Sequence, residues 1–505
     1  MLESYVKKIL SAKVYDLAQE TPLTLAPALS KRLGCEVKLK REDLHSIFSF
    51  KLRGAYNKMA HLSSSERSRG VITASAGNHA QGVSVAANKL NIKATVVMGM
   101  NTPSIKIDAV RNYGAKVILH GDSYDEAAQF AYAKSELEKS IYIHPYDDPL
   151  VIAGQGTIGM EIASQHPTDI DAIFVPVGGG GLIAGIAAYF KYLRPRTKII
   201  GVEAEGSACL YEAKRSGKRI KLAKETLDLF ADGVSVSQVG KESFKVARDY
   251  VDTVVKVSTD EICAAIKDVF EDTRAIPEPA GALAVAGMKK YLSRPKRDFS
   301  TVVSIVSGAN VNFDRLRHIS ERAEIGEERE AIFAVTIKEK KGSFLKFCGD
   351  LGRRSITEFN YRKTDDQSAN VYVGLEIAQK EDRSDLLRKL RGRGYRVLDM
   401  TKNEAAKVHI RHMVGGPKQG SETELLFRFE FPERPGALLE FLSVVGARWD
   451  ISLFHYRNHG AAWGRVLVGF RSDNGKREEL SQYLEKIGYR YWEEDANPAY
   501  KMFLS

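Results

Sequence analysis

Lys51 occupies the start of an expected helix, where a positive charge is unfavourable. Apolar residues follow it with the i, i+3, i+4, i+7 spacing of one buried helix face: Leu52, Ala55, Tyr56 and Met59. Ser49 precedes the lysine at the expected N-cap position. Because the helix dipole disfavours an ammonium in the first turn, we expect the amine to serve chemistry, such as a covalent imine with a carbonyl cofactor. The alternative is a solvated surface lysine among the 75 Lys and Arg residues of the chain.

Three turns, each directly after an apolar strand, carry groups that could surround such a cofactor. The first turn is Ser75-Ala76-Gly77-Asn78-His79, after the expected strand 70–74. It supplies hydroxyl, amide, imidazole and backbone N–H groups within five residues. At the start of a helix, free N–H groups can hold a carboxylate. A tight turn without a ligand is the alternative.

The second turn is Gly178-Gly179-Gly180-Gly181, between the expected strand 173–177 and a helix that begins at Leu182. Four glycines remove every side chain, so backbone N–H groups can close on a phosphate with the helix dipole behind them. The stretch does not match GxxxxGK[ST], and no acidic partner of a GxGxxG motif is clear, so a nucleotide is not the first choice. A flexible connection is the alternative. The third turn begins at Ser307, after strand 301–306; its hydroxyl could bond a ring nitrogen or merely start a turn.

Composition limits the class of protein. The chain has 505 residues, of which 44% are hydrophobic and 28% charged, as expected for a globular protein with more than one domain. It has no apolar run of about 18 residues and no signal-peptide core, so we expect a cytoplasmic protein without a membrane partner. The net charge is +11, but 64 acidic residues are interleaved with the basic ones, which favours anionic small molecules over nucleic acid. The four cysteines form no CxxC motif and are expected to be reduced core residues.

The elements that must position these turns follow an α/β pattern to about residue 325. Further strands are expected at 36–40, 94–98 and 115–119, with helices at 83–90 and 123–134. Strands that alternate with helices indicate a parallel sheet covered on both faces. In such sheets ligands bind at the carboxyl ends of the strands, where all three turns would lie. The charged stretch 321–330 is expected to be a linker.

Together these motifs resemble those of the fold-type II pyridoxal-phosphate enzymes, whose catalytic domain is like the tryptophan synthase β subunit. The resemblance is closest to the biosynthetic threonine dehydratases (threonine ammonia-lyases) and covers nearly all of the chain. The stretches that carry it are 49–55, 75–82, 178–182 and 307–310. It implies that residues 1–325 form a catalytic domain that binds pyridoxal 5'-phosphate.

The resemblance also implies roles for individual residues. Lys51 would carry the cofactor as a Schiff base, beside Phe50, and would act as the base that removes the α-hydrogen of the substrate. Asn78 would bond the ring hydroxyl, and Ser307 would face the pyridine nitrogen. The phosphate would be cradled by Gly178, Gly179, Gly180, Gly181 and Leu182. The substrate carboxylate would be framed by Ser75, Ala76, Gly77 and His79.

The implied reaction converts L-threonine to 2-oxobutanoate and ammonia, the committed step of isoleucine biosynthesis, with L-serine as a further substrate. Relatives that racemise serine carry a second serine where this chain has Ala76, which cannot move a proton, so we expect no racemase activity. Those relatives also bind a divalent cation near Glu203. Here the matching positions are Ser207 and Cys209, so we expect no metal.

The remainder of the chain contains an internal repeat. The stretch 339–347 is echoed by 433–441, and 394–396 by 488–490. Each copy has the order strand, helix, two strands, helix, strand of a ferredoxin-like unit, at 331–403 and 425–497, with a linker at 415–420. The resemblance implies two ACT-like regulatory domains that bind isoleucine as inhibitor and valine as its antagonist, in a homotetramer.

Three alternatives stay open on the sequence. The repeat could be a packing module, for example for dimerisation. The enzyme could be a catabolic serine/threonine dehydratase or a cysteine-forming synthase, although the long duplicated tail argues against both. A non-catalytic amino-acid-binding regulator is the third alternative. The joint presence of Lys51, Asn78, the glycine turn and Ser307 argues against that regulator.

Overall fold

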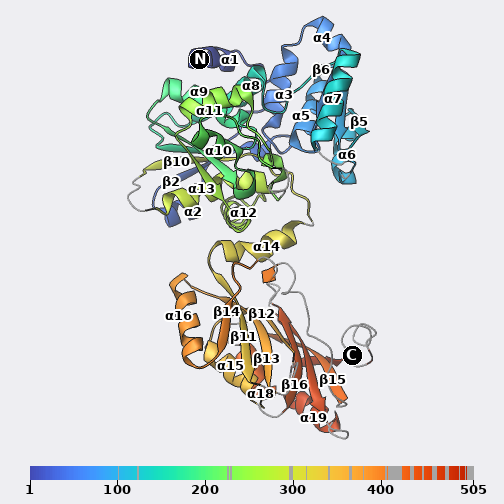
Figure 1. Ribbon diagram of the computed structural model, residues 1–505, viewed down its shortest axis with the longest axis vertical. Coiled ribbons are helices and arrows are strands. Elements are labelled where there is room, and N and C mark those ends of the chain that lie inside the picture. The colour runs from blue at the N-terminus through green and yellow to red at the C-terminus, as the bar shows by residue number, and fades with distance from the viewer. Residues whose placement is uncertain are drawn as a thin grey trace. The chain divides into compact units, whose positions relative to one another are not determined.

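The computed structural model places the chain in two compact units, residues 1–326 and 327–505 (Figure 1). It describes all residues except 101, 122–123, 224–226, 228–229, 295–298, 314, 339, 341, 363–366, 379, 404–405, 408–422, 433–436, 446–448, 458–462, 473–476, 488, 495 and 497–505. The expected linker 415–420 and the first residues of the second repeat motif, 433–436, lie outside the described residues.

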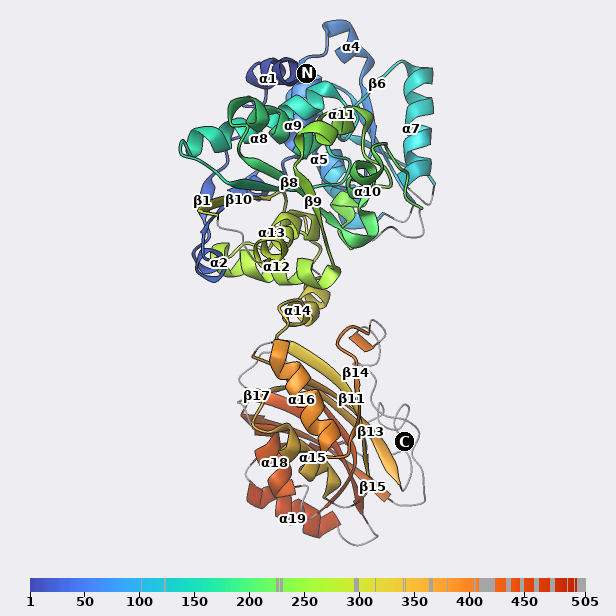
Figure 2. The same ribbon diagram turned by 60° about the vertical axis from the view of Figure 1, so that its left-hand side comes forward.

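The first unit contains a six-stranded sheet in which β1 is antiparallel and the other strands are parallel. Its order is β1 (Leu23–Leu25), β2 (Glu36–Arg41), β10 (Thr301–Val306), β7 (Ala172–Pro176), β8 (Lys198–Ala204) and β9 (Thr253–Val257). Helices α8 (Pro149–Gln165) and α9 (Gly181–Leu193) cover one face, and α12 (Thr259–Thr273) and α13 (Pro279–Leu292) the other (Figure 2). Phe174 packs into one core and Ile173 and Val175 into the other, which is why β7 is apolar throughout.

A second, four-stranded parallel sheet has the order β5 (Lys116–Leu119), β4 (Ala94–Met98), β3 (Val71–Ala74) and β6 (Ile141–Tyr142). Helices α5 (Asn78–Lys89) and α7 (Tyr124–Glu138) pack on it, and α3 (Lys51–Ala60) packs on α5 and shares its core. The unit is completed by α1 (Leu2–Leu10), α2 (Pro27–Leu33), η1 (Glu42–Leu44), α4 (Ser64–Arg69), α6 (Ser104–Asn112), η2 (Glu205–Ser207), α10 (Cys209–Ser216), η4 (Asp232–Val234), α11 (Lys241–Tyr250) and α14 (Arg315–Gly326). The expected α/β class with parallel sheets is confirmed.

Two local predictions are wrong. The N-cap of α3 is Phe50; Ser49 lies one residue earlier, where its hydroxyl accepts the Lys51 N–H at 3.4 Å and its backbone forms a β-bridge with Gly308. The expected linker 321–330 is helical as far as Gly326, where α14 ends. Its charged residues have partners on α12, since Arg322 Nε donates to Asp260 at 2.7 Å.

The second unit is built on one eight-stranded antiparallel sheet with the order β14-β11-β13-β12-β16-β17-β15-β18. The first half comprises β11 (Glu330–Lys338), α15 (Ser343–Leu351), β12 (Ile356–Arg362), β13 (Ser368–Glu376), α16 (Lys380–Gly392) and β14 (Arg396–Asp399). The second comprises β15 (Thr423–Pro432), α18 (Ala437–Val445), β16 (Asp450–Arg457), β17 (Trp463–Ser472), α19 (Arg477–Ile487) and β18 (Arg490–Glu493). Both halves have the expected βαββαβ order, and pairing of β12 with β16 joins them.

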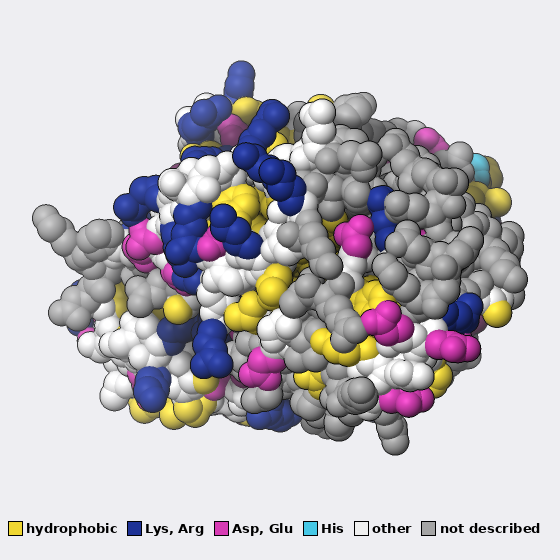
Figure 3. Space-filling model, turned by 90° about the horizontal axis from the view of Figure 1, so that it is seen from below, with side chains coloured by type: hydrophobic (Ala, Val, Ile, Leu, Met, Phe, Trp, Pro, Cys, Tyr) yellow, Lys and Arg dark blue, Asp and Glu magenta, His cyan; other side chains and the backbone are white. Residues whose placement is uncertain are grey.

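Several smaller features complete the fold. All four cysteines are free; three are buried, and Cys35 is half-buried and packs against the core of the six-stranded sheet. In the part of the chain that the structure describes, no helix is long and apolar enough to cross a membrane. On the face in Figure 3, Lys and Arg side chains are interspersed with Asp and Glu.

Candidate active site

Lys51 is the first residue of α3 and is partly buried. Its Nζ donates a hydrogen bond to the carbonyl of Pro145 at 3.0 Å. Burial lowers the pKa of Lys51 to about 8, although the negative charge of Glu278 opposes this shift. A fraction of the amine is therefore neutral near neutral pH, as a nucleophile or base requires.

Short contacts hold the backbone of Lys51 in place. The N–H of Phe50 donates to the carbonyl of Ser307 at 3.2 Å, next to the bridge between Ser49 and Gly308. On the other side, a Cβ added to Gly82 of α5 would lie 3.1 Å from the carbonyl oxygen of Lys51. The lysine is thereby brought beside the Ser307 turn, about 250 residues away in sequence, and beside the helix that begins at Asn78.

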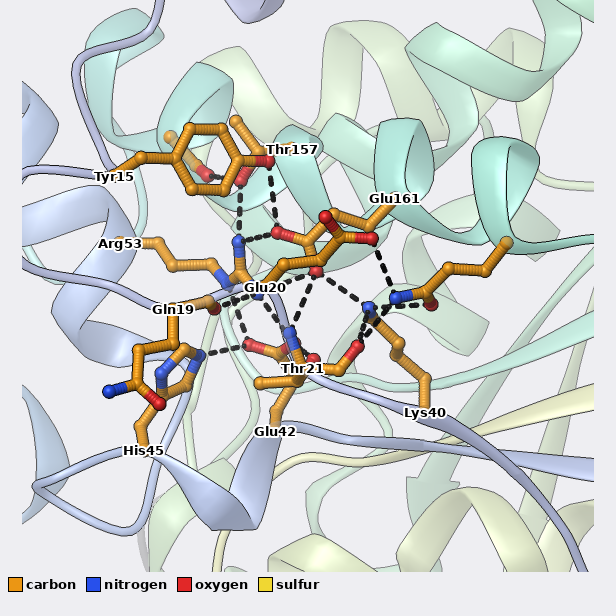
Figure 4. Close-up of polar contacts among 12 residues, drawn as sticks. Tyr15, Gln19, Glu20, Thr21, Lys40, Glu42, His45, Arg53, Thr157 and Glu161 are labelled. Carbon is orange, nitrogen blue, oxygen red and sulfur yellow. Dashed lines mark hydrogen bonds and ion pairs between the residues drawn. The ribbon is translucent and has the colours of Figure 1, made fainter.

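Two residues after the lysine, a buried network of charges anchors α3 (Figure 4). Arg53 donates from Nε and Nη2 to Glu42 at 2.7 and 2.9 Å and from Nη2 to Glu161 at 2.9 Å. Lys40 donates to Glu161 at 2.6 Å, and His45 bonds Glu42 at 3.0 Å. All five side chains are at most 2% exposed. The network therefore ties α3 to α8, to the end of β2 and to the short helix that follows it.

The glycine turn lies where β7 ends and α9 begins. Gly180 has a φ of +87°, a conformation that favours glycine. A Cβ on Gly179 would lie 2.3 Å from the ring of Tyr146, and one on Gly181 would lie 2.6 Å from the Tyr146 carbonyl. The first N–H groups of a helix have no intrahelical partners. Since no side chain caps α9, these groups are available to a ligand. This uncapped helix start, in a cradle that any Cβ would fill, fits a phosphate.

Gly179→Ala should weaken binding of pyridoxal 5'-phosphate by at least about tenfold, because the added methyl group overlaps Tyr146 and displaces the turn. The dissociation constant for the cofactor-free protein, from a fluorescence titration, measures this. Gly349→Ala is the matched control, since a Cβ there meets nothing within 4 Å. Equal affinities of the two variants would contradict the assignment of the cradle.

The first turn lies at the carboxyl end of β3, in the second sheet. Gly77 is the N-cap of α5 and no side chain caps this helix; Ser75 Oγ accepts the Gly77 N–H at 3.2 Å. The His79 imidazole bonds the carbonyl of Ile143 through Nε2 at 3.0 Å, and burial lowers its pKa to about 3. The ring is therefore neutral and bound to the main chain, so the group that His79 can offer a carboxylate is its backbone N–H.

The remaining predicted residues converge on the same region. Ser307 and Gly178 follow neighbouring strands, β10 and β7, and Ser307 Oγ donates to the carbonyl of Ala280 at 3.3 Å. Asn78 donates from Nδ2 to Glu278 at 2.6 Å and accepts from Asn310 at 2.7 Å.

Other predicted residues lie close by. The Phe50 ring lies 5.4 Å from Lys51 Nζ. Leu182 is buried in the first turn of α9, and Ala76 is partly buried and packs against the core of the second sheet.

Four residues of this region were not predicted from the sequence: Pro145, Tyr146, Glu278 and Asn310. Glu278 lies between two prolines at a helix start, which is a weak signal, and Asn310 is the last residue of the stretch 307–310. For Pro145 and Tyr146 we find no signal in the sequence, since their place depends on contacts with Lys51 and the glycine turn.

Glu203 lies next to the start of α10, where its carboxylate accepts main-chain hydrogen bonds. Glu203 accepts the N–H groups of Leu210 and Tyr211, both at 2.8 Å. Burial raises its pKa to about 8, although these hydrogen bonds oppose the rise. Glu203 therefore caps α10. Among the described residues, no group of three or more His, Cys, Asp or Glu side chains could hold a metal ion.

A partly buried amine, an uncapped helix start after four glycines and several polar side chains are the groups that a pyridoxal-phosphate site requires. Comparison with known proteins supports this. Residues 14–308 match the family of pyridoxal-phosphate-dependent enzymes, and residues 321–410 and 415–504 each match the C-terminal regulatory domain of threonine dehydratase.

Individual relatives narrow the class. L-threonine dehydratase biosynthetic IlvA from Burkholderia multivorans is 53% identical over 99% of both chains. The protein of that name from Escherichia coli is 49% identical over 99% of this chain and 97% of its own. The solved structure of the processed form of threonine deaminase isoform 2 from Solanum lycopersicum is 51% identical, with a TM-score of 0.62, and covers 64% of this chain and 93% of its own. The chain belongs to the pyridoxal-phosphate-dependent enzymes and, within them, to the biosynthetic threonine dehydratases.

Proposed function

We propose that the protein converts L-threonine to 2-oxobutanoate and ammonia with pyridoxal 5'-phosphate. We propose that it also converts L-serine to pyruvate. The observation that carries the proposal is the position of Lys51, whose amine donates to the carbonyl of Pro145 while the next residue, Tyr146, covers the glycine turn. An amine and a phosphate cradle are thus joined through two adjacent residues.

The groups of the chain have distinct roles in this proposal. The cofactor, when bound, supplies a conjugated ring that acidifies the α-hydrogen. Lys51 binds its carbonyl and takes up the proton from the α-carbon. The start of α5 holds the substrate carboxylate through backbone N–H groups. Ser307 offers the ring nitrogen a neutral hydroxyl, and Ala76 cannot deliver a proton from the opposite face.

A keto-acid assay tests the proposal. We expect 2-oxobutanoate from L-threonine and pyruvate from L-serine, without D-serine. A lack of keto acid from threonine in the cofactor-loaded protein would refute the proposal. Keto acid from serine alone, without any response to isoleucine, would favour the catabolic alternative.

For the second unit we propose feedback inhibition by isoleucine, with valine as antagonist, in a cytoplasmic homotetramer that serves isoleucine biosynthesis. A shallow hollow between its two halves is the candidate amino-acid site; its free volume is about 20 Å³, so it would have to widen to admit an amino acid. Its lining comes from both halves: Ile337, Lys340, Gly342, Ser343, Phe344, Leu345, Tyr361, Trp449, Asp450 and Ile451. Apolar walls suit a branched side chain, and Lys340 and Asp450 have the charges opposite to a carboxylate and an ammonium. Light scattering would test the tetramer.

Deletion of residues 327–505 should leave threonine turnover within about threefold of the full chain but abolish inhibition by isoleucine, because each unit has its own core. Activity is measured over a range of isoleucine concentrations, and the visible absorption of the bound cofactor shows that the catalytic unit has folded. Inhibition that persists in the truncated protein would place the effector site in the first unit.

A further inference from the structure

Glu278 has a buried carboxylate at the centre of the site. It is the N-cap residue of α13 but does not cap this helix with its side chain. Its Oε1 accepts the Asn78 amide at 2.6 Å, and a Cβ on Gly308 would lie 2.6 Å from the same oxygen. Glu278 is 5% exposed. The carboxylate therefore lies between the Asn78 turn and the turn that begins at Ser307.

Glu278 and Asn310, on the side of the six-stranded sheet, both form hydrogen bonds with Asn78. Asn78 follows β3 in the four-stranded sheet, whereas Asn310 follows β10 in the six-stranded sheet. Asn310 Nδ2 donates to Asn78 Oδ1 at 2.7 Å. Because the amide oxygen and nitrogen of Asn78 each have a partner, the orientation of this amide is set. The nitrogen of an amide carries two hydrogens, so one N–H is left for an acceptor in the site.

The charge of Glu278 also acts on the reactive amine. It opposes the effect of burial on the pKa of Lys51. The other titratable groups that act on Lys51 or are acted on by it are His79 and His144, and burial lowers their pKa values to about 3 and about 4, so both are neutral. Glu278 itself faces Asp232 and Lys106.

We propose that Glu278 is a positioning residue of the cofactor site: it holds the Asn78 amide across the two sheets and, from a backbone bonded to Gly308 beside the Ser49 bridge, supplies negative charge to the surroundings of the Lys51 amine. The proposal depends on the proposed function only for the identity of the cofactor. Burial raises the pKa of Glu278 to about 7, with Asp232 adding to the rise and Asn78 and Lys106 opposing it. Its charge is therefore present above about pH 7 and lost below.

Two substitutions separate the two roles. Glu278→Gln keeps an oxygen that can accept the Asn78 amide but removes the charge, whereas Glu278→Ala removes both. The first readout is the pH dependence of Lys51 modification by an amine reagent in cofactor-free protein, followed by mass spectrometry. We expect both variants to lower the pKa of Lys51 by about one unit. Glu205→Gln is the control, because Glu205 is an exposed acid 3.8 Å from Lys290. This variant should leave the pKa of Lys51 unchanged.

The second readout is the dissociation constant for pyridoxal 5'-phosphate. Glu278→Ala and Asn78→Ala should each weaken binding about tenfold, and Glu278→Gln by less than about threefold. The double variant should bind no more weakly than Asn78→Ala, because both changes remove one interaction. Additive losses, or an unchanged Lys51 pKa in Glu278→Gln, would overturn the proposal. The Lys51 measurement uses neither cofactor nor substrate, so it stands even if threonine is not turned over.

Discussion

Lys51→Ala should lower the rate of 2-oxobutanoate formation by at least about 10⁴-fold. The same amine binds the cofactor carbonyl and serves as base, so its removal ends two functions at once. We also expect the visible absorption band of the bound cofactor to change, because covalent attachment is lost. The initial rate with threonine and the absorption spectrum of the loaded protein measure the two effects.

A second lysine of the same helix is the control. Lys58 pairs with Asp148 at 2.8 Å and its side chain is 21% exposed. Lys58→Ala should keep activity within about twofold, since a partly exposed ion pair contributes little. If Lys51→Ala retained both the absorption band and more than about one-hundredth of the activity, another base would have to be sought.

Arg53→Ala should reduce the free energy of unfolding by about 3–5 kcal/mol, because it leaves the carboxylates of Glu42 and Glu161 buried without their main counter-charge. Since α3 begins two residues earlier at Lys51, cofactor affinity should fall as well. Urea unfolding followed by fluorescence measures the first effect and a cofactor titration the second.

The loss of unfolding free energy in Arg53→Ala should depend on pH. Burial alone would raise the pKa of Glu42, but the charges of Arg53 and His45 outweigh it and hold this pKa well below its usual range. A depressed pKa contributes stability that is present above the unfolded value and lost as pH falls through the folded one. Without Arg53 the folded pKa of Glu42 rises. Protonation of Glu42 then removes the unpaired buried charge and with it part of the destabilisation of the variant. The stability difference should be largest near about pH 8 and smaller near about pH 5.

Arg248→Ala is the matched control for this experiment, because Arg248 pairs with Asp249 on the surface, where both side chains are more than 40% exposed. It should change stability by less than about 0.5 kcal/mol at either pH. A loss below about 1 kcal/mol for Arg53→Ala, or one that grows as pH falls, would contradict the role given to the network.

Much of the site could be predicted because each of its turns is local. A glycine turn between an apolar strand and a helix is determined by residues within a few positions of each other, and so is the amphipathic pattern after Lys51. The two βαββαβ halves could be predicted for the same reason, since the repeat presents one local pattern twice, once in each half. Their joining into one sheet through β12 and β16 could not, because pairing of two edge strands leaves no periodic signal.

The errors have the same physical origin. Ser49 was expected to cap α3 from its type and position, but its backbone pairs with Gly308. The charged stretch at the end of the first unit was expected to be a linker, but part of it is helical because Arg322 has a partner on α12. In both cases a contact between distant segments changed the local structure, although the Ser49 hydroxyl still accepts the Lys51 N–H.

The sequence by itself determined which groups are present and in which local elements: an amine at a helix start, a side-chain-free turn before a helix, and a duplicated tail. Only the tertiary structure decided their chemical state. The pKa of Lys51 is set by burial and by Glu278, and the Asn78 amide is oriented by a carboxylate 200 residues away. Solvent exclusion and charge act through space, so they depend on the folded chain rather than on neighbours in sequence.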